Sequence, residues 1–177
     1  NPYDAKGLLK AAIRDNDPVV FLESERMYGD KGEVPEGEYI IPIGLASVTK
    51  KGTDVTIVSY NKTMKIALAA AEELEKEDIS AEVIDLRTIR PMDYATIIES
   101  VKKTNRLVVV EETWPFCGIS TEIAFNVQRH AFDHLDAPIK RVTQADTPLP
   151  FATQLIDESL PNVPRVIDAV KSLLYLN

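Results

Sequence analysis

The segment from residue 81 to residue 101 changes its hydrophobic period, and this change constrains the fold more than any other feature. Residues 82–87 (EVIDLR) have the composition of a strand, and residues 88–91 (TIRP) end it at a proline. Asp93 is placed to cap a helix, and apolar residues follow with helical spacing over 97–101. A strand that passes directly into a helix is the unit of parallel sheets covered by helices. The segment therefore predicts an α/β fold.

The composition limits the classes of protein to which the chain can belong. Its 177 residues are 45% hydrophobic and 27% charged, which predicts a globular protein with one domain and part of another. No apolar run reaches the roughly 20 residues of a membrane span, so we expect no membrane association. The formal net charge of −8 argues against nucleic acid as a ligand and favours a basic protein partner. One cysteine, Cys117, fits a reducing compartment.

Other hydrophobic patterns predict the remaining elements. Asp4 is expected to cap a first helix, Pro18 to end it, and residues 19–22 to form a strand. Strands are predicted at 43–48 and 55–60, joined by a turn so short that it permits only an antiparallel pair. Beyond them we predict a helix capped by Asn61, a strand at 107–110, a helix over 119–127, a strand at 139–142, a Pro-rich loop and a last helix over 166–174. These elements predict a three-layer α/β/α domain with a mixed, mostly parallel sheet, whose early edge strand is antiparallel.

Glu111 and Glu112 follow the strand predicted at 107–110. Open α/β sheets bind ligands at the carboxyl ends of their strands, and paired carboxylates can divide acid and base roles. The alternative is two solvated side chains that end a strand. The sequence favours this alternative, because it offers no nearby base or nucleophile.

His130 and His134 are four residues apart, the spacing at which zinc-binding helices place two ligands on one face. Because the glutamate of the zinc-hydrolase pattern is absent, surface imidazoles near a helix end are the preferred interpretation. Cys117 stands before Gly118, either at a helix N-terminus that stabilises a thiolate or as a small apolar residue packed under a turn. The packed residue is the preferred prediction for Cys117.

Asp15, Asn16 and Asp17 bring oxygen groups to the end of the first predicted helix, where free carbonyls can hold a hard cation. A plain helix stop before Pro18 explains the same residues, and the residues alone favour it. The chain contains neither GxGxxG nor GxxxxGK[ST], so no residues support nucleotide binding.

Several separate stretches of the chain match the sequence motifs of one protein family. They are residues 4–15 (DAKGLLKAAIRD), 16–23 (NDPVVFLE), 41–44 (IPIG), 82–93 (EVIDLRTIRPMD), 114–115 (WP), 135–138 (LDAP) and 141–143 (RVT). Together they resemble the β-subunit family of the pyruvate dehydrogenase E1 component, over essentially the whole chain. The resemblance is to the C-terminal half of that subunit. Residues 111–117 (EETWPFC) depart from it, because family members often carry EGGWPQ or EEGWPQ there.

The resemblance implies a domain organisation and a set of cofactors. Residues 1–23 would be the tail of a pyrimidine-binding domain, 24–40 a linker, and 41–177 a transketolase C-terminal-type domain. Such subunits form an α2β2 tetramer that uses thiamine diphosphate. In this family the α subunit holds the diphosphate and its magnesium, and the glutamate that bonds the aminopyrimidine lies upstream of this segment. No catalytic residue is therefore expected in the chain.

Two binding functions map onto residues of this chain through the resemblance. A structural potassium ion would be held by backbone carbonyls of the segment that contains Ala12, Ile13, Asp15 and Asp17, with Asp17 standing where the family has Asn. The peripheral subunit-binding domain of the E2 acyltransferase would dock on Asp136 and, if the chain ends naturally, on the terminal carboxylate of Asn177. The acidic net charge suits such a basic partner.

The leading hypothesis is therefore a part of an E1 β subunit that supports pyruvate decarboxylation and acetyl transfer to lipoyl-E2 through assembly and docking. Its partners would be the E1 α subunit, a second β subunit and E2, in a bacterial cytoplasm or a mitochondrial matrix. The fragment alone is expected to be inactive. The alternatives are a branched-chain 2-oxoacid dehydrogenase β subunit, a single-chain transketolase-like synthase, or a non-catalytic adaptor domain.

Overall fold

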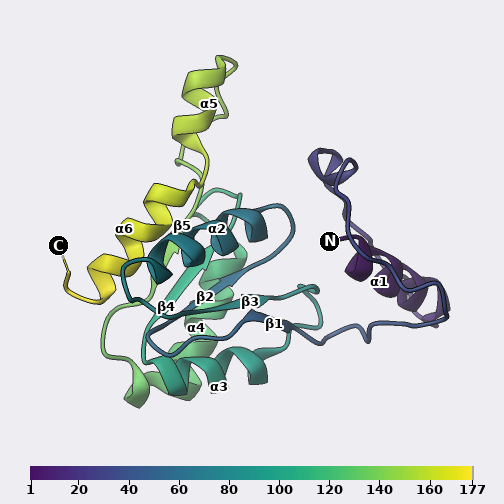
Figure 1. The fold of residues 1–177 in the computed structure, drawn as a ribbon, viewed down its shortest axis with the longest axis horizontal. Coiled ribbons are helices and arrows are strands. Elements are labelled where there is room, and N and C mark those ends of the chain that lie inside the picture. The colour runs from purple at the N-terminus through teal and green to yellow at the C-terminus, as the bar shows by residue number, and fades with distance from the viewer. Residues whose placement is uncertain (177) are drawn as a thin grey trace.

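A computed structural model describes residues 1–176 of the chain. Strands and helices alternate along most of it (Figure 1). The strands are β1 (Ser47–Lys50), β2 (Val55–Ser59), β3 (Ala81–Asp85), β4 (Leu107–Val110) and β5 (Lys140–Val142). The helices are α1 (Pro2–Arg14), α2 (Thr63–Glu75), α3 (Tyr94–Thr104), α4 (Ile119–Ala131), α5 (Thr153–Ser159) and α6 (Val163–Leu173), with short 3₁₀ turns η1 (Glu25–Met27) and η2 (Phe132–His134).

The five strands form one mixed sheet in the order β1-β3-β2-β4-β5. β2 is parallel to both β3 and β4, β5 is parallel to β4, and β1 is antiparallel to β3, with an irregular register between Val48 and Lys50. The predicted mixed, mostly parallel sheet with an antiparallel edge strand is therefore confirmed.

The predicted hairpin between the first two strands of the sheet is wrong, because β1 and β2 lie on opposite sides of β3. The connecting turn crosses the start of β3, where the N–H groups of Thr53 and Asp54 donate to the Ser80 carbonyl at 3.0 and 2.9 Å. Gly52 lies directly against the β3 backbone, since a Cβ there would be 2.2 Å from Ala81 C and from Glu82 N. A short turn thus joins two strands that both pair with a third.

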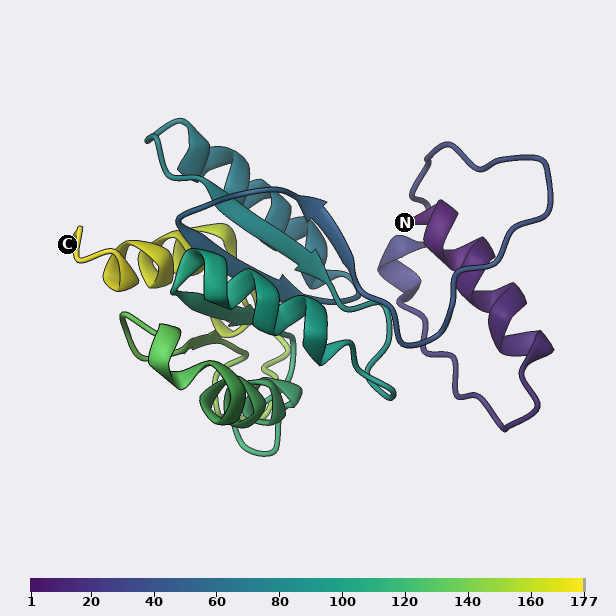
Figure 2. The same ribbon diagram turned by 90° about the horizontal axis from the view of Figure 1, so that it is seen from below.

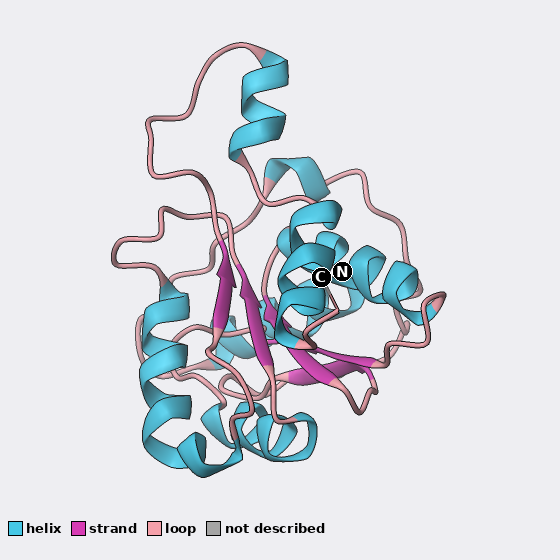
Figure 3. Cartoon of the chain, turned by 90° about the vertical axis from the view of Figure 1, so that its left-hand side faces the viewer, coloured by secondary structure: helices cyan, strands magenta, loops and turns pink. Residues whose placement is uncertain are grey.

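The sheet is buried on both faces, and successive strand residues divide between two apolar clusters. Ile57 and Val110 pack with α2 and α6 on one face, whereas Val58 and Val109 pack with α3 and α4 on the other. Figure 3 shows helices on either side of the strands. The three-layer α/β/α prediction is confirmed.

Several predicted boundaries differ from the structure. Asn1, not Asp4, caps α1, because its side chain accepts from the Asp4 N–H at 2.8 Å. Residues 19–22 form no strand and are largely exposed, since none of the five strands within residues 1–176 pairs with them. Asn61 makes no cap to α2, whose N-cap residue is Lys62. The predicted Pro-rich loop contains α5, which projects from the sheet (Figure 1).

The prediction for Asp93 is confirmed in detail. Its carboxylate accepts from the Thr96 N–H at 3.1 Å and so caps α3. The same carboxylate accepts from the Ala46 N–H at 3.0 Å, just before β1. One side chain thus begins a helix and positions the edge strand.

The N-terminal segment lies to one side of the sheet (Figure 2). Three polar contacts connect it to the rest of the chain. Asp4 on α1 pairs with Arg87 at 2.7 Å, Asp30 pairs with Lys65 on α2 at 2.6 Å, and the Ile41 N–H donates to the Gly7 carbonyl at 3.2 Å. Among the described residues, no helix is long and apolar enough to cross a bilayer.

Replacing Gly52 tests the close approach of the turn to β3. We expect Gly52→Ala to lower the free energy of unfolding by at least about 2 kcal/mol, because the added methyl group overlaps backbone atoms that cannot move independently. Gly37→Ala is the control, since a Cβ at Gly37 meets no atom within 4 Å, and should change stability by less than about 1 kcal/mol. Urea unfolding of the two variants measures both values. Equal stability of the two would contradict this packing.

Candidate functional site

Glu111 lies at the carboxyl end of β4 and is completely buried. Its two carboxylate oxygens accept from the Ser120 N–H at 3.2 and 3.1 Å, the Ser120 hydroxyl donates to Oε1, and the Tyr60 hydroxyl donates to Oε2 at 3.1 Å. The preferred prediction of two solvated carboxylates is therefore wrong for Glu111. The signal that could have found it is the Ser120 hydroxyl and N–H at the start of the next helix, where a carboxylate is favoured.

This arrangement makes Glu111 a structural anchor. Burial, followed by the charge and hydrogen bond of Glu111, raises the pKa of Tyr60 far above its usual range. A Cβ at Gly118 would lie 2.3 Å from Glu111 Oε1, so a larger residue there would have to displace the carboxylate. Glu112 instead points outward, where it pairs with Lys62 at 2.5 Å. The two carboxylates therefore share no site for acid and base chemistry.

The loop between β4 and α4 is held by one of its backbone carbonyls and by the Trp114 side chain, and it exposes apolar side chains. Arg141 donates to the Pro115 carbonyl at 2.9 Å, and the Trp114 indole N–H donates to the Thr147 carbonyl at 2.9 Å. Phe116 is nevertheless 79% exposed. Cys117 is also exposed, in a left-handed conformation (φ 57°), so the prediction that it packs under a turn is wrong.

The two histidines do not share a helix. His130 lies in the last turn of α4, whereas His134 lies in η2, because α4 ends at Ala131. Within residues 1–176, no group of three His, Cys, Asp or Glu side chains is arranged to hold a metal ion. The preferred interpretation of both histidines as surface residues agrees with their exposure.

The segment predicted to hold potassium is the exposed C-terminal end of α1. The Asp15 N–H donates to the Ala12 carbonyl at a long 3.4 Å, and Asp15 Oδ1 accepts from the Asp17 N–H at 2.9 Å. Ile13 is the last but one residue of α1, where helix carbonyls lack partners within the helix. Carbonyl and carboxylate oxygens fit the chemistry of a hard cation, and the potassium site stays a prediction.

Asp136 lies between η2 and β5, on a loop that is held from two sides. Its N–H donates to the Asn105 carbonyl at 3.0 Å, and its own carbonyl accepts from the Tyr175 hydroxyl at 3.3 Å. Its side chain is 54% exposed, and Oδ2 lies 3.3 Å from a terminal nitrogen of Arg106. Asn177, the other predicted docking residue, lies outside the described residues.

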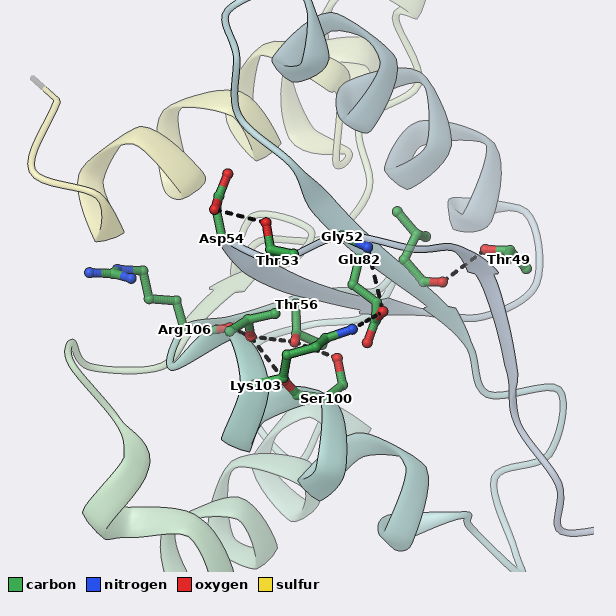
Figure 4. Close-up of polar contacts among 11 residues, drawn as sticks. Thr49, Gly52, Thr53, Asp54, Thr56, Glu82, Ser100, Lys103 and Arg106 are labelled. Carbon is green, nitrogen blue, oxygen red and sulfur yellow. Dashed lines mark hydrogen bonds and ion pairs between the residues drawn. The ribbon is translucent and has the colours of Figure 1, made fainter.

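A buried polar cluster lies at the opposite, amino end of the strands (Figure 4). Glu82 on β3 accepts from Lys103 and, at 3.4 Å, from the Gly52 N–H. Beside it the Thr56 hydroxyl contacts those of Ser100 at 2.6 Å and Thr104 at 2.7 Å. Because parallel α/β sheets bind ligands at the other end of their strands, this cluster has a structural role.

The fold is that of an α/β domain of the transketolase C-terminal class, with a mixed sheet between two helical layers. A family model described as "Transketolase, C-terminal domain" matches residues 44–166. The chain therefore belongs to the transketolase C-terminal domain family. A solved structure described as "Split gene transketolase, inactive beta4 tetramer" has a TM-score of 0.69 and 29% identity, covering 82% of this chain and 46% of that one.

Two curated relatives indicate which kind of subunit the chain resembles. It is 54% identical to the pyruvate dehydrogenase E1 component subunit beta of Rhizobium meliloti, over 98% of this chain and 39% of the relative. It is 48% identical to the acetoin:2,6-dichlorophenolindophenol oxidoreductase subunit beta of Bacillus subtilis, over 98% of this chain and 51% of the relative. The chain thus spans about half or less of the length of these relatives.

The described residues do not fit a thiamine diphosphate site of their own. Two open surface cavities, of about 350 and 530 Å³, lie among the described residues, and neither is lined by a glycine-rich diphosphate loop or by a group of metal-binding side chains. No chemical step of such a cofactor can be assigned to residues of this part of the chain.

The Glu82 cluster predicts a pH-dependent contribution to stability. Burial opposes ionisation of Glu82, but hydrogen bonds from Lys103, Ser100 and the Gly52 N–H outweigh it and hold the pKa of Glu82 below its ordinary value. The stabilisation is therefore complete above the unfolded pKa, near 4.5, and is lost as the pH falls through the folded pKa.

We expect Glu82→Gln to lower the free energy of unfolding by about 1–3 kcal/mol at pH 7 and by clearly less at pH 3. Urea titrations of both proteins at the two pH values provide the measurement. Glu75→Gln removes the same charge from a side chain that is 67% exposed in its ion pair with Lys50. It should have a small effect on the free energy of unfolding at both pH values. A loss for Glu82→Gln that is the same at pH 7 and pH 3 would disprove this assignment.

Proposed function

We propose that the chain is the C-terminal part of the β subunit of a pyruvate dehydrogenase E1 component. In this proposal it supports the thiamine-diphosphate-dependent oxidative decarboxylation of pyruvate and acetyl transfer to lipoyl-E2. The observation that carries the proposal is 54% identity to the Rhizobium meliloti subunit over 98% of the chain. In this proposal its contribution is assembly and docking, because Glu111 and Glu112, the carboxylates that the sequence singles out, share no site for acid and base chemistry.

The proposed domain organisation assigns residues 1–23 to the tail of a pyrimidine-binding domain, 24–40 to a linker and 41–177 to the C-terminal domain. Two features support it. The family match begins at residue 44, and residues 18–40 contain only the single 3₁₀ turn η1. The cofactor and its magnesium would then be held by the rest of the β subunit and by an E1 α subunit, in a heterotetramer with two β chains.

The exposed apolar side chains support an assembly role. Ile13, Val20 and Leu22 in the N-terminal segment, and Phe116 beside α4, are each more than 70% exposed. Three of these four residues lie within ten positions of one another in the N-terminal segment, and apolar side chains that gather at a surface are typical of contacts with other protein parts. The split-gene transketolase described as an inactive β4 tetramer is a protein whose β chains associate without activity, as we propose for a β chain without its α partner.

Substrate preference is the first test, because the acetoin oxidoreductase subunit is the competing relative. The parent β subunit, combined with its α subunit and thiamine diphosphate, should have a kcat/KM for pyruvate at least about tenfold above that for acetoin or branched-chain 2-oxo acids. The assay follows reductive acetylation of a lipoyl domain. A preference for either competitor would overturn the pyruvate assignment, and the 177-residue chain alone should show no turnover.

We also propose that Asp136 belongs to the surface on which the basic peripheral subunit-binding domain of E2 docks, together with the terminal carboxylate of Asn177 if the chain ends naturally there. The support is a half-exposed carboxylate on a loop held from two sides, in a chain with a net charge of −8. The compartment would be a bacterial cytoplasm or a mitochondrial matrix.

Removing the Asp136 carboxylate tests the docking surface. In the parent heterotetramer, Asp136→Ala should raise the Kd for an isolated E2 subunit-binding domain by about tenfold, because a charged partner group loses its counter-charge. Titration calorimetry at low salt is the measurement. Asp146→Ala removes the same charge from an exposed loop at the other end of β5 and should leave the Kd unchanged. Equal Kd values for both variants would exclude Asp136 from the docking surface.

A further inference from the structure

We propose that Arg106 is a positioning residue of the docking surface, which fixes the Asp136 carboxylate relative to the end of α6. This inference rests on the proposed docking of a basic E2 domain at Asp136. It adds a residue that the motif carrying Asp136 does not contain, since Arg106 is thirty positions upstream and precedes β4.

Arg106 connects two segments that are distant in the sequence. One terminal nitrogen lies 3.3 Å from Asp136 Oδ2, and Nε donates to the Leu173 carbonyl, in the last turn of α6, at 3.1 Å. A positive group is favoured at such a helix end. The guanidinium therefore joins the loop before β5 to the C-terminal helix.

The Arg106 side chain projects from a rigid base. Its backbone carbonyl accepts from the Thr56 N–H at 2.9 Å and from the Thr104 hydroxyl at 3.2 Å, so it belongs to the buried cluster at the amino end of the strands. Figure 4 shows the side chain extending away from Lys103 and Ser100. With 22% of that side chain exposed, the guanidinium has little freedom to reorient.

The residues after α6 also contact Asp136 directly, in addition to the link through Arg106. The Tyr175 hydroxyl donates to the Asp136 carbonyl at 3.3 Å, and the Asn105 side chain donates to the His134 carbonyl at 2.7 Å. Asp136 is thus held against the α3–β4 junction and against the residues after α6. Its carboxylate stays 54% exposed, which leaves it accessible to a cation of a partner.

The energies indicate that this ion pair serves orientation more than stability. A pair as exposed as this one contributes at most about 1 kcal/mol to folding. The planar guanidinium, however, donates a hydrogen bond to the Leu173 carbonyl through Nε and places a terminal nitrogen beside Asp136 in a fixed direction, a fork that a lysine ammonium cannot reproduce. Loss of this fork would leave Asp136 and the end of α6 free to move separately, and a partner would have to order both on binding.

The proposal can be distinguished from a simple charge effect, because the two predict opposite changes in the Kd for the basic domain when Arg106 is made neutral. If Arg106 acted only as a positive charge beside Asp136, its removal would make the surface more negative and tighten binding of a basic domain. If it positions Asp136, both the neutral variant Arg106→Gln and the charge-preserving variant Arg106→Lys weaken binding.

The experiment is a double-mutant cycle in the parent heterotetramer, with titration of an isolated E2 subunit-binding domain. We expect Arg106→Gln and Arg106→Lys each to raise the Kd by about threefold to tenfold. Neither substitution should have a further effect in the Asp136→Ala background. Lys50→Gln, which removes the same charge from an ion pair with Glu75 at the other sheet edge, should leave the Kd unchanged.

Three results would overturn the positioning role: tighter binding by Arg106→Gln, an unchanged Kd for Arg106→Lys, or losses that add to those of Asp136→Ala. Thermal unfolding of each variant shows whether a loss of binding reflects a loss of folding instead, and a lowered Tm that accounts for the weaker binding would also contradict the proposal. Failure of the docking proposal itself is separate, because Asp136→Ala would then leave the Kd unchanged.

Discussion

Burial of β2 on both faces is the constraint on which the rest of the structure depends. All five residues of this strand are buried, and, like β4, it pairs in parallel on both sides. Its alternate side chains supply both apolar clusters, so both pairs of helices must cover the sheet. The turn at Gly52 then decides the order of strands, since it places β1 beyond β3 instead of beside β2. From this order follow the positions of Glu82, Arg106 and Glu111 at the two ends of the sheet.

The elements defined by local patterns could be predicted from the sequence. The strand at 107–110 has its predicted limits, and Asp93 caps α3 as its position before an apolar repeat indicates. The prediction of a strand at 19–22 was wrong for a physical reason. Residues rich in β-branched side chains favour a strand only where a sheet can pair with them, and within residues 1–176 no strand pairs with 19–22. The pairing of β1 with β3 depends on a backbone contact between residues thirty positions apart, which no local pattern contains.

For the functional residues too, local patterns could be predicted from the sequence, whereas contacts between distant segments could not. The sequence pattern leaves Glu111 with two interpretations, and only the position of Ser120 reveals that the carboxylate is enclosed. Cys117 was expected under a turn but lies at the surface, in a left-handed backbone conformation that the sequence does not indicate. Asp136 could be identified only by resemblance, and its contact with Arg106 could not, because the loop before β5 and the end of α6 meet only in the folded chain.

Both edges of the sheet are poor templates for a further strand. β5 has only three residues, two of which are the exposed bases Lys140 and Arg141, and β1 is irregular before Lys50. Short, charged or irregular edges prevent strand addition between chains. A complex built from this domain must therefore join its members through side chains on helices and loops, where single substitutions can tune each contact, and not through a backbone ladder shared across the boundary.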